Sequence, residues 1–325
     1  MKHVLVIRLS ALGDVAILAP VLRLAVSRRP DVHYTVAGPP LLAPLFAGIE
    51  RVDYLGVAKR QGTMAMMRRL RSVSVDEVAD MHGVLRVRRA LLLLRLDALL
   101  HGRWLKVRRL RKGRLSRWLF IHGVSRKPRR QQWRRYADVL GVAADAAPSI
   151  TSAPSPSTPP TVGVAPFAQH GGKVWPWEYV CELVRMLAAA GYRVLLFGSA
   201  DEAHRLERLA ASTPGVESTA GRHPFAEELD LIGSLSLMVS MDSANMHFAS
   251  ALGIPVVSIW GATHPDFGFY GFNQDPANAL CANLPCQPCS AYGQRPCRHG
   301  DLRCMHAVTP AMVFERISKL VAGSR

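Results

Sequence analysis

Two charged residues stand in loops that directly follow apolar runs, where an α/β enzyme places its reactive groups. Asp14 follows the apolar run 3–8, and Lys173 lies in the glycine-rich segment 170–178. A carboxylate such as Asp14 can act as general base toward a hydroxyl group. An ammonium such as Lys173 can neutralise charge that grows on a leaving diphosphate. Each residue also has a structural alternative: Asp14 as a helix cap beside Gly13, and Lys173 as a solvated loop residue.

The segment 237–261 (LMVSMDSANMHFASALGIPVVSIWG) predicts a strand, a polar turn, a helix and a second strand. Free N–H groups at the start of such a helix bind anions, so a diphosphate would fit at this turn. The candidate donor-binding residues are Asp242, Ser243, Ala244, Asn245 and His247. We expect Asp242 to organise the loop rather than touch phosphate, since both are negative. His247 is either a phosphate ligand or a buried structural histidine.

A polar and then aromatic loop follows at residues 261–272, and with Gly13 and His170 it supplies further candidates for a ligand cleft. Thr263 and His264 are its polar members. Aromatic loops stack on sugars and bases, or else anchor the loop to the core. The chain has no Asp-x-Asp pair, which disfavours a metal-bridged sugar nucleotide.

The order of apolar runs and helical patterns predicts an α/β protein with two Rossmann-like domains that face each other across a cleft. The predicted boundaries are 1–147 for an N-terminal domain, 148–161 for a Pro- and Ser-rich linker, and 162–325 for a C-terminal domain. A C-terminal helix, 311–321, could pack on either domain. Neither a G-x-G-x-x-G pattern after the first strand nor a Walker A pattern is present.

Charge is concentrated in one segment. Residues 59–135 contain 23 Lys and Arg against four acidic residues, whereas the rest of the chain contains 18 basic and 20 acidic residues. Such a field attracts a polyanion: nucleic acid, an anionic membrane leaflet or a phosphorylated glycolipid. The alternative is a solvated basic face without a partner. No apolar run is long enough for a membrane span or a secretory signal, so we expect a cytosolic protein.

Five of the six cysteines lie near the C-terminus. In a reducing compartment, four of them could form a structural zinc knuckle: Cys286, Cys289, Cys297 and Cys304. Free thiols in a packed, Pro-rich excursion are the alternative. Either reading gives these cysteines a structural rather than a catalytic role.

Three motifs, VLVIRLSALGDV, HGGKVWPWEYV and SMDSANMHFASALGIPVVSIWGATHP, resemble glycosyltransferase family 9, the lipopolysaccharide heptosyltransferases of Gram-negative bacteria. The resemblance implies a GT-B fold and metal-independent, inverting transfer from ADP-heptose to an inner-core lipopolysaccharide acceptor, with no catalytic cofactor. It also implies that the domain 1–147 binds the acceptor and the domain 162–325 the nucleotide sugar. The general base then falls on Asp14, the phosphate-stabilising lysine on Lys173 and the nucleotide loop on residues 242–247. Ala244 stands where the family often has Gly, and its methyl group could crowd the phosphates.

The sequence therefore predicts a glycosyltransferase that moves a heptose or related sugar from an ADP-sugar to a lipopolysaccharide core acceptor. We expect it to be peripherally associated with the inner membrane of a Gram-negative bacterium through residues 59–135, with nucleic acid not the expected partner. Two alternatives stay open. One is a sugar-nucleotide epimerase, or a transferase for another nucleotide sugar on the same fold. The other is a non-catalytic polyanion- or membrane-binding protein.

Overall fold

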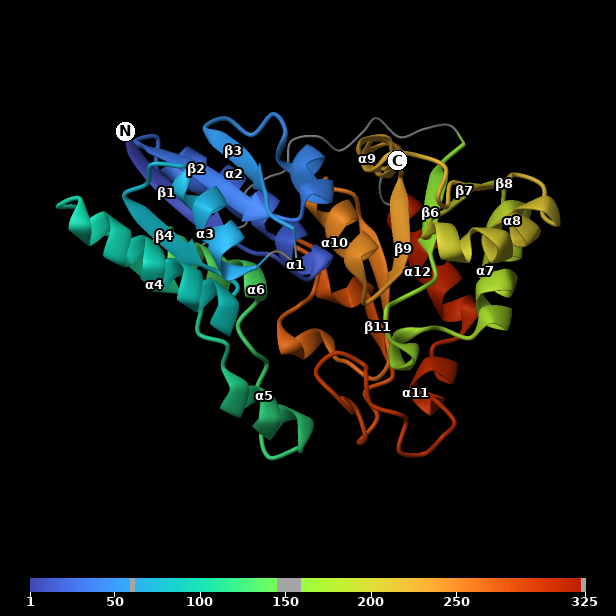
Figure 1. Cartoon of the computed structure of the whole chain (residues 1–325). Helices are drawn as coiled ribbons and strands as arrows, with labels where there is room; N and C mark the ends of the chain where they lie inside the picture. Colours follow the sequence, from blue (N-terminus) through green and yellow to red (C-terminus); the bar gives the residue numbers. More distant parts are fainter. Residues whose placement is uncertain (59–61, 145–158, 323–325) are drawn as a thin grey trace. The chain divides into compact units, whose positions relative to one another are not determined.

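The computed structural model divides by contacts into two units (Figure 1). It describes residues 1–58, 62–144 and 159–322. The first unit comprises Met1–Lys112 and Gln132–Ser149, and the second comprises Gly113–Gln131 and Ile150–Arg325. Most of the predicted linker, 148–161, falls outside the described residues. The predicted domain boundaries stay a prediction, and the contacts assign Gly113–Gln131 to the second unit although the sequence suggested the first.

The first unit is built on a five-stranded parallel sheet in the order β3-β2-β1-β4-β5. Four residues of the central strand β1, from Val4 to Ile7, are buried, as expected of a parallel strand covered on both faces. The register aligns Ile7 with Ala37 on one side and with Asp80 on the other. The strands are β1 (Lys2–Ile7), β2 (Val32–Gly38), β3 (Val52–Gly56), β4 (Glu77–Asp80) and β5 (Lys106–Arg109).

In this unit α3 packs against α4, and α2 packs against both α6 and α1. The core under α3 and α4 includes Leu5 and Ile7 from β1 together with Met66, Leu70 and Leu91 from the helices. The helices are α1 (Leu12–Ala16), α2 (Leu18–Arg28), α3 (Thr63–Arg71), α4 (Leu85–Leu100) and α6 (Gln132–Leu140), with a 3₁₀ helix at Pro40–Phe46. Helices α1 and α2 follow β1 in direct succession, separated by one residue.

The second unit contains a six-stranded sheet in the order β11-β10-β9-β6-β7-β8, with every pair parallel. Its strands are β6 (Thr161–Ala165), β7 (Arg193–Leu196), β8 (Val216–Ser218), β9 (Leu237–Met241), β10 (Val256–Trp260) and β11 (Ala279–Cys281). The core joins Val162, Val164 and Val239 of the strands to Leu183 and Val184 of α7. These two sheets confirm the α/β prediction with two Rossmann-like halves.

The helices of the second unit include one, α5, that lies within the basic segment 59–135. They are α5 (Arg114–Ile121), α7 (Trp177–Ala189), α8 (Ala203–Ala211), α9 (Phe225–Gly233), α10 (Ala244–Ala251), α11 (Arg303–His306) and α12 (Pro310–Ala322), with short 3₁₀ helices at Gly171–Lys173, Ala200–Glu202, Pro265–Phe267 and Pro276–Asn278. The C-terminal helix α12 packs on α7 and β10 of the same unit. Among the described residues, no helix is both long and apolar enough to cross a membrane.

Both sheets have a topological switch point, and it decides where functional side chains gather. In the first sheet the strand order reverses between β1 and β4, and in the second between β6 and β9. Loops leaving the carboxyl ends of two such strands diverge to opposite faces and open a crevice for ligands. Asp14 follows β1, Lys173 follows β6 and Asp242 follows β9, so these candidates all stand at switch points.

Candidate functional site

In the second unit, three loops at the carboxyl edge bring together a lysine, an aspartate and a threonine. The loops follow the adjacent strands β6, β9 and β10. Lys173 Nζ lies 3.2 Å from Asp242 Oδ2, and Thr263 Oγ1 donates to the same oxygen at 2.8 Å. Asp242 and Thr263 are both buried. The carboxylate therefore fixes the Lys173 ammonium at the sheet edge, where it can face a ligand.

Glycines allow these loops to approach closely. Ala262 N donates to Gly172 O at 2.8 Å, and a Cβ added at Gly172 would lie 2.8 Å from the Ala262 methyl carbon. Gly293 has φ +78°, and a Cβ there would lie 2.5 Å from Lys173 Cγ. Any larger residue at Gly293 must displace the stem of Lys173. The glycine-rich loop thus has a steric purpose that spacing alone did not reveal.

The turn after β9 leads into α10 without a side-chain cap. Ser243 is the N-cap residue with φ −140° and ψ −178°, but its side chain makes no capping hydrogen bond, and its Oγ lies 3.0 Å from Ser240 Oγ. The amides of the first turn are therefore not occupied by Ser243 and suit an anionic ligand. Ala244 is the first helical residue and is not among the residues with positive φ, so its methyl group causes no backbone strain.

The remaining candidates of this edge differ in how they are held. His247 is buried on the first turn of α10. His170 caps the 3₁₀ helix Gly171–Lys173, and its carbonyl accepts the Lys173 amide at 2.9 Å. His264 is engaged at both ring nitrogens: Nδ1 accepts from Asp266 N at 3.1 Å, and Nε2 lies 2.9 Å from Asn283 Oδ1. His264 therefore holds its own loop.

In the first unit, Asp14 forms an ion pair with Arg8. The Arg8 Nη2 group contacts Asp14 Oδ2, and Arg8 Nη1 donates to the carbonyl of Met81 at 2.6 Å, which ties the loop after β1 to the loop after β4. Asp14 is the third helical residue of α1, not its N-cap, which is Ala11. Asp14 is therefore not the N-cap residue. Its Oδ2 instead accepts a weak hydrogen bond from the backbone amide of the N-cap residue, Ala11, at 3.4 Å.

The two carboxylate oxygens of Asp14 have different surroundings. Oδ2 carries the contacts to Arg8 and Ala11. Oδ1 is buried and has no hydrogen-bond partner in the described part of the chain. One oxygen of this carboxylate is therefore fixed and the other keeps an unused acceptor position, which a general base needs.

Two further titratable residues lie near this ion pair, and sequence reasoning missed both. Burial lowers the pKa of His82 to about 4, and the positive charges of Arg8 and Lys112 act in the same direction. Burial also raises the pKa of the Tyr136 hydroxyl, which lies in the electrostatic range of Arg8 and Asp14. His82 lies two residues after the end of β4, so its place after a buried strand was the available signal. Tyr136 lies on α6, and its place in the sequence carried no such signal.

The profile of glycosyltransferase family 9 (heptosyltransferase) matches residues 63–297, which is more than half of the chain. The chain belongs to this family. The match contains Lys173 and residues 242–247 and leaves Asp14 outside. It confirms the family that the three sequence motifs indicated.

Curated relatives and solved structures agree with this assignment. The lipopolysaccharide heptosyltransferase 2 of Escherichia coli K12 is 37% identical over 114 residues, a match that spans only 33% of this chain and 33% of the relative. The structure of E. coli ADP-heptose LPS heptosyltransferase II covers 100% of this chain and 99% of its own, with TM-score 0.69 and 20% identity. E. coli heptosyltransferase WaaC with ADP gives TM-score 0.70 at 21% identity, over 98% and 100%. The fold of this family 9 chain is therefore GT-B.

The zinc prediction for this family 9 chain is not supported. Among the described residues, no three His, Cys, Asp or Glu side chains are arranged to hold a metal ion, and all six cysteines are free. Burial raises the pKa of Cys304 to about 11 and also raises that of Cys289, with neighbouring thiols adding to both effects. Backbone hydrogen bonds near His299 lower the pKa of Cys297. All six cysteines lie in the described part of the chain and form no disulfide there, and the zinc knuckle and the free-thiol alternative both stay predictions.

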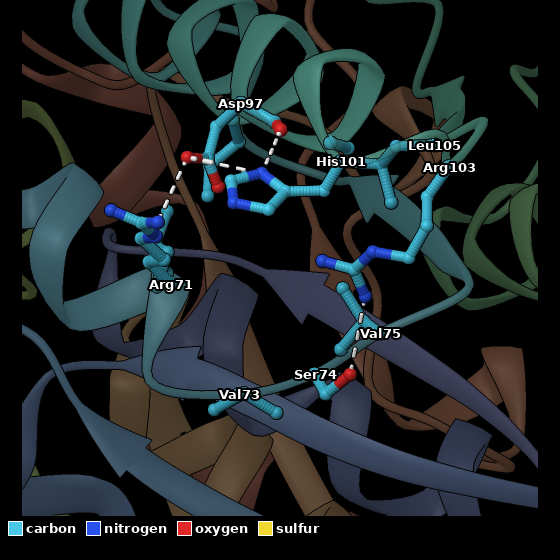
Figure 2. Close-up of a pocket in the computed structure, with 11 residues that line it drawn as sticks. Arg71, Val73, Ser74, Val75, Asp97, His101, Arg103 and Leu105 are labelled. Atoms are coloured by element: carbon cyan, nitrogen blue, oxygen red, sulfur yellow. Dashed lines mark hydrogen bonds and ion pairs between the residues drawn. The ribbon is translucent and has the colours of Figure 1, made fainter.

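A cavity of about 200 Å³ lies elsewhere in the first unit (Figure 2). It is bordered by Val73, Ser74 and Val75 ahead of β4 and by Leu105 ahead of β5, so it opens at the amino edge of the sheet, opposite Asp14. Arg103 Nη1 donates to Ser74 Oγ at 3.3 Å across it. The cavity is distinct from the residues that the family motifs indicate.

Proposed function

We propose that this chain is an inverting, metal-independent glycosyltransferase that moves a heptose from an ADP-sugar to a lipopolysaccharide core acceptor. The observation that carries the proposal is the convergence of Lys173 and Thr263 on Asp242 beside the uncapped start of α10. A fixed ammonium and free helix amides are the groups that stabilise a departing diphosphate without a metal ion. Family membership and the named activity of the E. coli relatives support the donor class.

In this mechanism an acceptor hydroxyl oxygen attacks the anomeric carbon of the donor sugar. Asp14 Oδ1 takes the hydroxyl proton while Arg8 holds Oδ2 in place. The bond between the anomeric carbon and the diphosphate oxygen breaks, and ADP leaves with the bonding electrons. Lys173 and the first amides of α10 stabilise the negative charge on ADP. Attack opposite to the leaving group inverts the anomeric configuration.

The acceptor and its location form the second part of the proposal. An anionic glycolipid acceptor agrees with the basic segment 59–135, which attracts phosphorylated headgroups and the anionic cytoplasmic leaflet of the inner membrane. Candidate residues at the cleft loops, Gly13, His170 and Thr263, stay predictions for acceptor or donor contacts.

The decisive experiment incubates the purified chain with ADP-heptose and an inner-core lipopolysaccharide acceptor, with and without EDTA, and follows ADP release and product mass. We expect transfer in both conditions and an inverted glycosidic bond. Isomerised donor in the absence of acceptor would identify an epimerase instead. A chain that shows neither transfer nor an ADP-dependent rise in melting temperature would be a non-catalytic binding protein.

A further inference from the structure

Helix α4 presents a row of leucines to solvent. Leu92, Leu96 and Leu99 are 57%, 50% and 59% exposed, and their spacing of four and three residues places them on one face of the helix. Leu85, seven residues before Leu92, extends the row toward the start of the helix and is also exposed. Single exposed leucines are common, but a contiguous row of this kind marks an interaction surface.

Packing in the first unit fixes which side of α4 faces outward. Leu91 and Leu94 are buried in the core beneath α4. Near the end of the helix, Asp97 Oδ1 pairs with Arg71 Nη2 of α3 at 3.0 Å, and His101 Nδ1 lies 2.7 Å from the Asp97 carbonyl (Figure 2). The ion pair with Arg71 and the buried leucines hold the inner face of α4 against the unit. The outer leucine row cannot turn inward without giving them up.

Arginines interrupt the row between Leu85 and Leu92, and an aromatic residue lies just beyond its end. Arg88 and Arg89 are exposed on the first turns of α4. Just beyond its end, Trp104 is 75% exposed, and the Arg95 guanidinium lies 5.3 Å from the centre of its ring. Leucines flanked by arginines and an exposed tryptophan are the composition of helices that lie in a membrane interface.

We propose that α4 docks on an anionic lipid surface, with its leucine row inserted at the boundary of headgroups and acyl chains and its arginines on lipid phosphates. This inference rests on the membrane partner of the proposed function and deepens it, because it assigns docking to an apolar face rather than to charge alone. The surface charge of segment 59–135 is complementary to such lipids.

Charge also disfavours a second copy of this chain as the occupant. A two-fold contact through this face would bring Arg88 and Arg89 of each copy toward the same charged helix of the other. The row is moreover carried on the convex surface of a helix. A bilayer accepts a convex apolar row and compensates the arginines.

The test measures binding of the full chain to vesicles without any donor sugar. Vesicles of phosphatidylglycerol and phosphatidylethanolamine are compared with neutral phosphatidylcholine vesicles by co-sedimentation. We expect wild type to prefer the anionic vesicles and Leu96→Gln/Leu99→Gln to bind them weaker by on the order of tenfold or more, given the apolar area lost. The control Leu41→Gln/Met312→Gln removes exposed apolar side chains elsewhere and should bind like wild type.

Two readouts separate docking from folding and from catalysis. An unchanged ADP-dependent melting shift in the leucine variant shows that the fold and the donor site persist. Brominated lipids should quench wild-type fluorescence more than that of Trp104→Phe. The proposal is overturned if the leucine variant binds vesicles like wild type, if Trp104 is not quenched, or if light scattering shows a wild-type dimer that the variant loses.

Discussion

The ammonium of Lys173 lies 3.2 Å from Oδ2 of Asp242, and the same oxygen accepts a hydrogen bond from the hydroxyl group of Thr263. Lys173 is thus held in place before any ligand arrives, which spares the cost of ordering a long side chain at the moment of reaction. That Asp242 organises the loop stays a prediction. The contacts of Asp242 with Lys173 and Thr263 agree with this role.

Replacing Lys173 with Ala should lower kcat on the order of a hundredfold, because one of the groups that stabilises the leaving diphosphate is lost. ADP affinity should fall less than kcat. Steady-state kinetics with ADP-heptose and calorimetric ADP titration measure the two effects. Lys319→Ala, an exposed lysine on α12 paired with Glu315, serves as the matched control. Equal loss of activity in both variants would contradict the assignment.

Gly293→Ala should also lower kcat, by displacing the Lys173 stem. Gly300→Ala is a close control, since Gly300 has φ +77° and no atom within 4 Å of an added Cβ, whereas Gly293 has φ +78° and Lys173 at 2.5 Å. Alanine introduces a similar backbone strain in both variants, because both glycines have a positive φ. We expect similar melting temperatures and a kcat defect only for Gly293→Ala. A defect shared by both variants would assign it to strain rather than to Lys173.

Asp14→Asn should abolish most transfer, with kcat lower by roughly a hundredfold to ten thousandfold, because an amide cannot accept the proton of the acceptor hydroxyl. ADP binding should persist, since Asp14 belongs to the first unit and the proposed diphosphate groups to the second. Transfer assays and the ADP-dependent melting shift are read together. Asp53→Asn, an exposed carboxylate on β3, is the control. Joint loss of ADP binding and activity would argue against a base.

Acid should destabilise the protein through His82. Its pKa is about 4 in the folded protein, and an unfolded histidine titrates near 6.5. Between those values the unfolded chain binds more protons, so stability falls as pH decreases from about 6.5 to about 4, by at most about 1.4 kcal/mol per pH unit from this residue. Above pH 6.5 the residue adds no pH dependence.

Melting curves of wild type and His82→Gln across pH 4 to 8 measure this effect. The variant should lose less stability than wild type over the acidic window, because glutamine does not titrate. His204→Gln, an exposed histidine on α8, should follow wild type. Parallel curves for wild type and His82→Gln would show that His82 is not held neutral.

The sequence predicted the fold well where apolar runs alternate with helical patterns, as from β1 to α4 and from β6 to β10. It failed in the basic stretch, where β5 and α5 lie. Arginines alternate there with few buried residues, so neither a period of two nor one of 3.6 stands out. The short strand β11 was missed because three residues carry too little pattern.

The sequence predicted which residues belong to the candidate site, but not which of them contact each other. Position after a buried strand pointed to Asp14, Lys173 and Asp242. The pairing of Asp14 with Arg8, six residues earlier, depends on the conformation of the loop after β1, which the sequence does not reveal. The contact of Thr263 with Asp242 depends on which strands are neighbours in the sheet. The described residues show no group of side chains arranged to hold a metal ion, so the zinc knuckle stays a prediction.

The assignment of Gly113–Gln131 to the second unit bears on how this chain can be divided. The segment is anchored there by Arg129 N on Asp266 O at 2.8 Å, by Arg126 on the carbonyls of Gln287 and Pro285, and by Phe120 beside Phe267. A fragment ending at residue 147 would carry this segment away from all of those partners. A fragment starting at 162 would lack it, so a cut at the linker separates the second unit from a segment that packs on it.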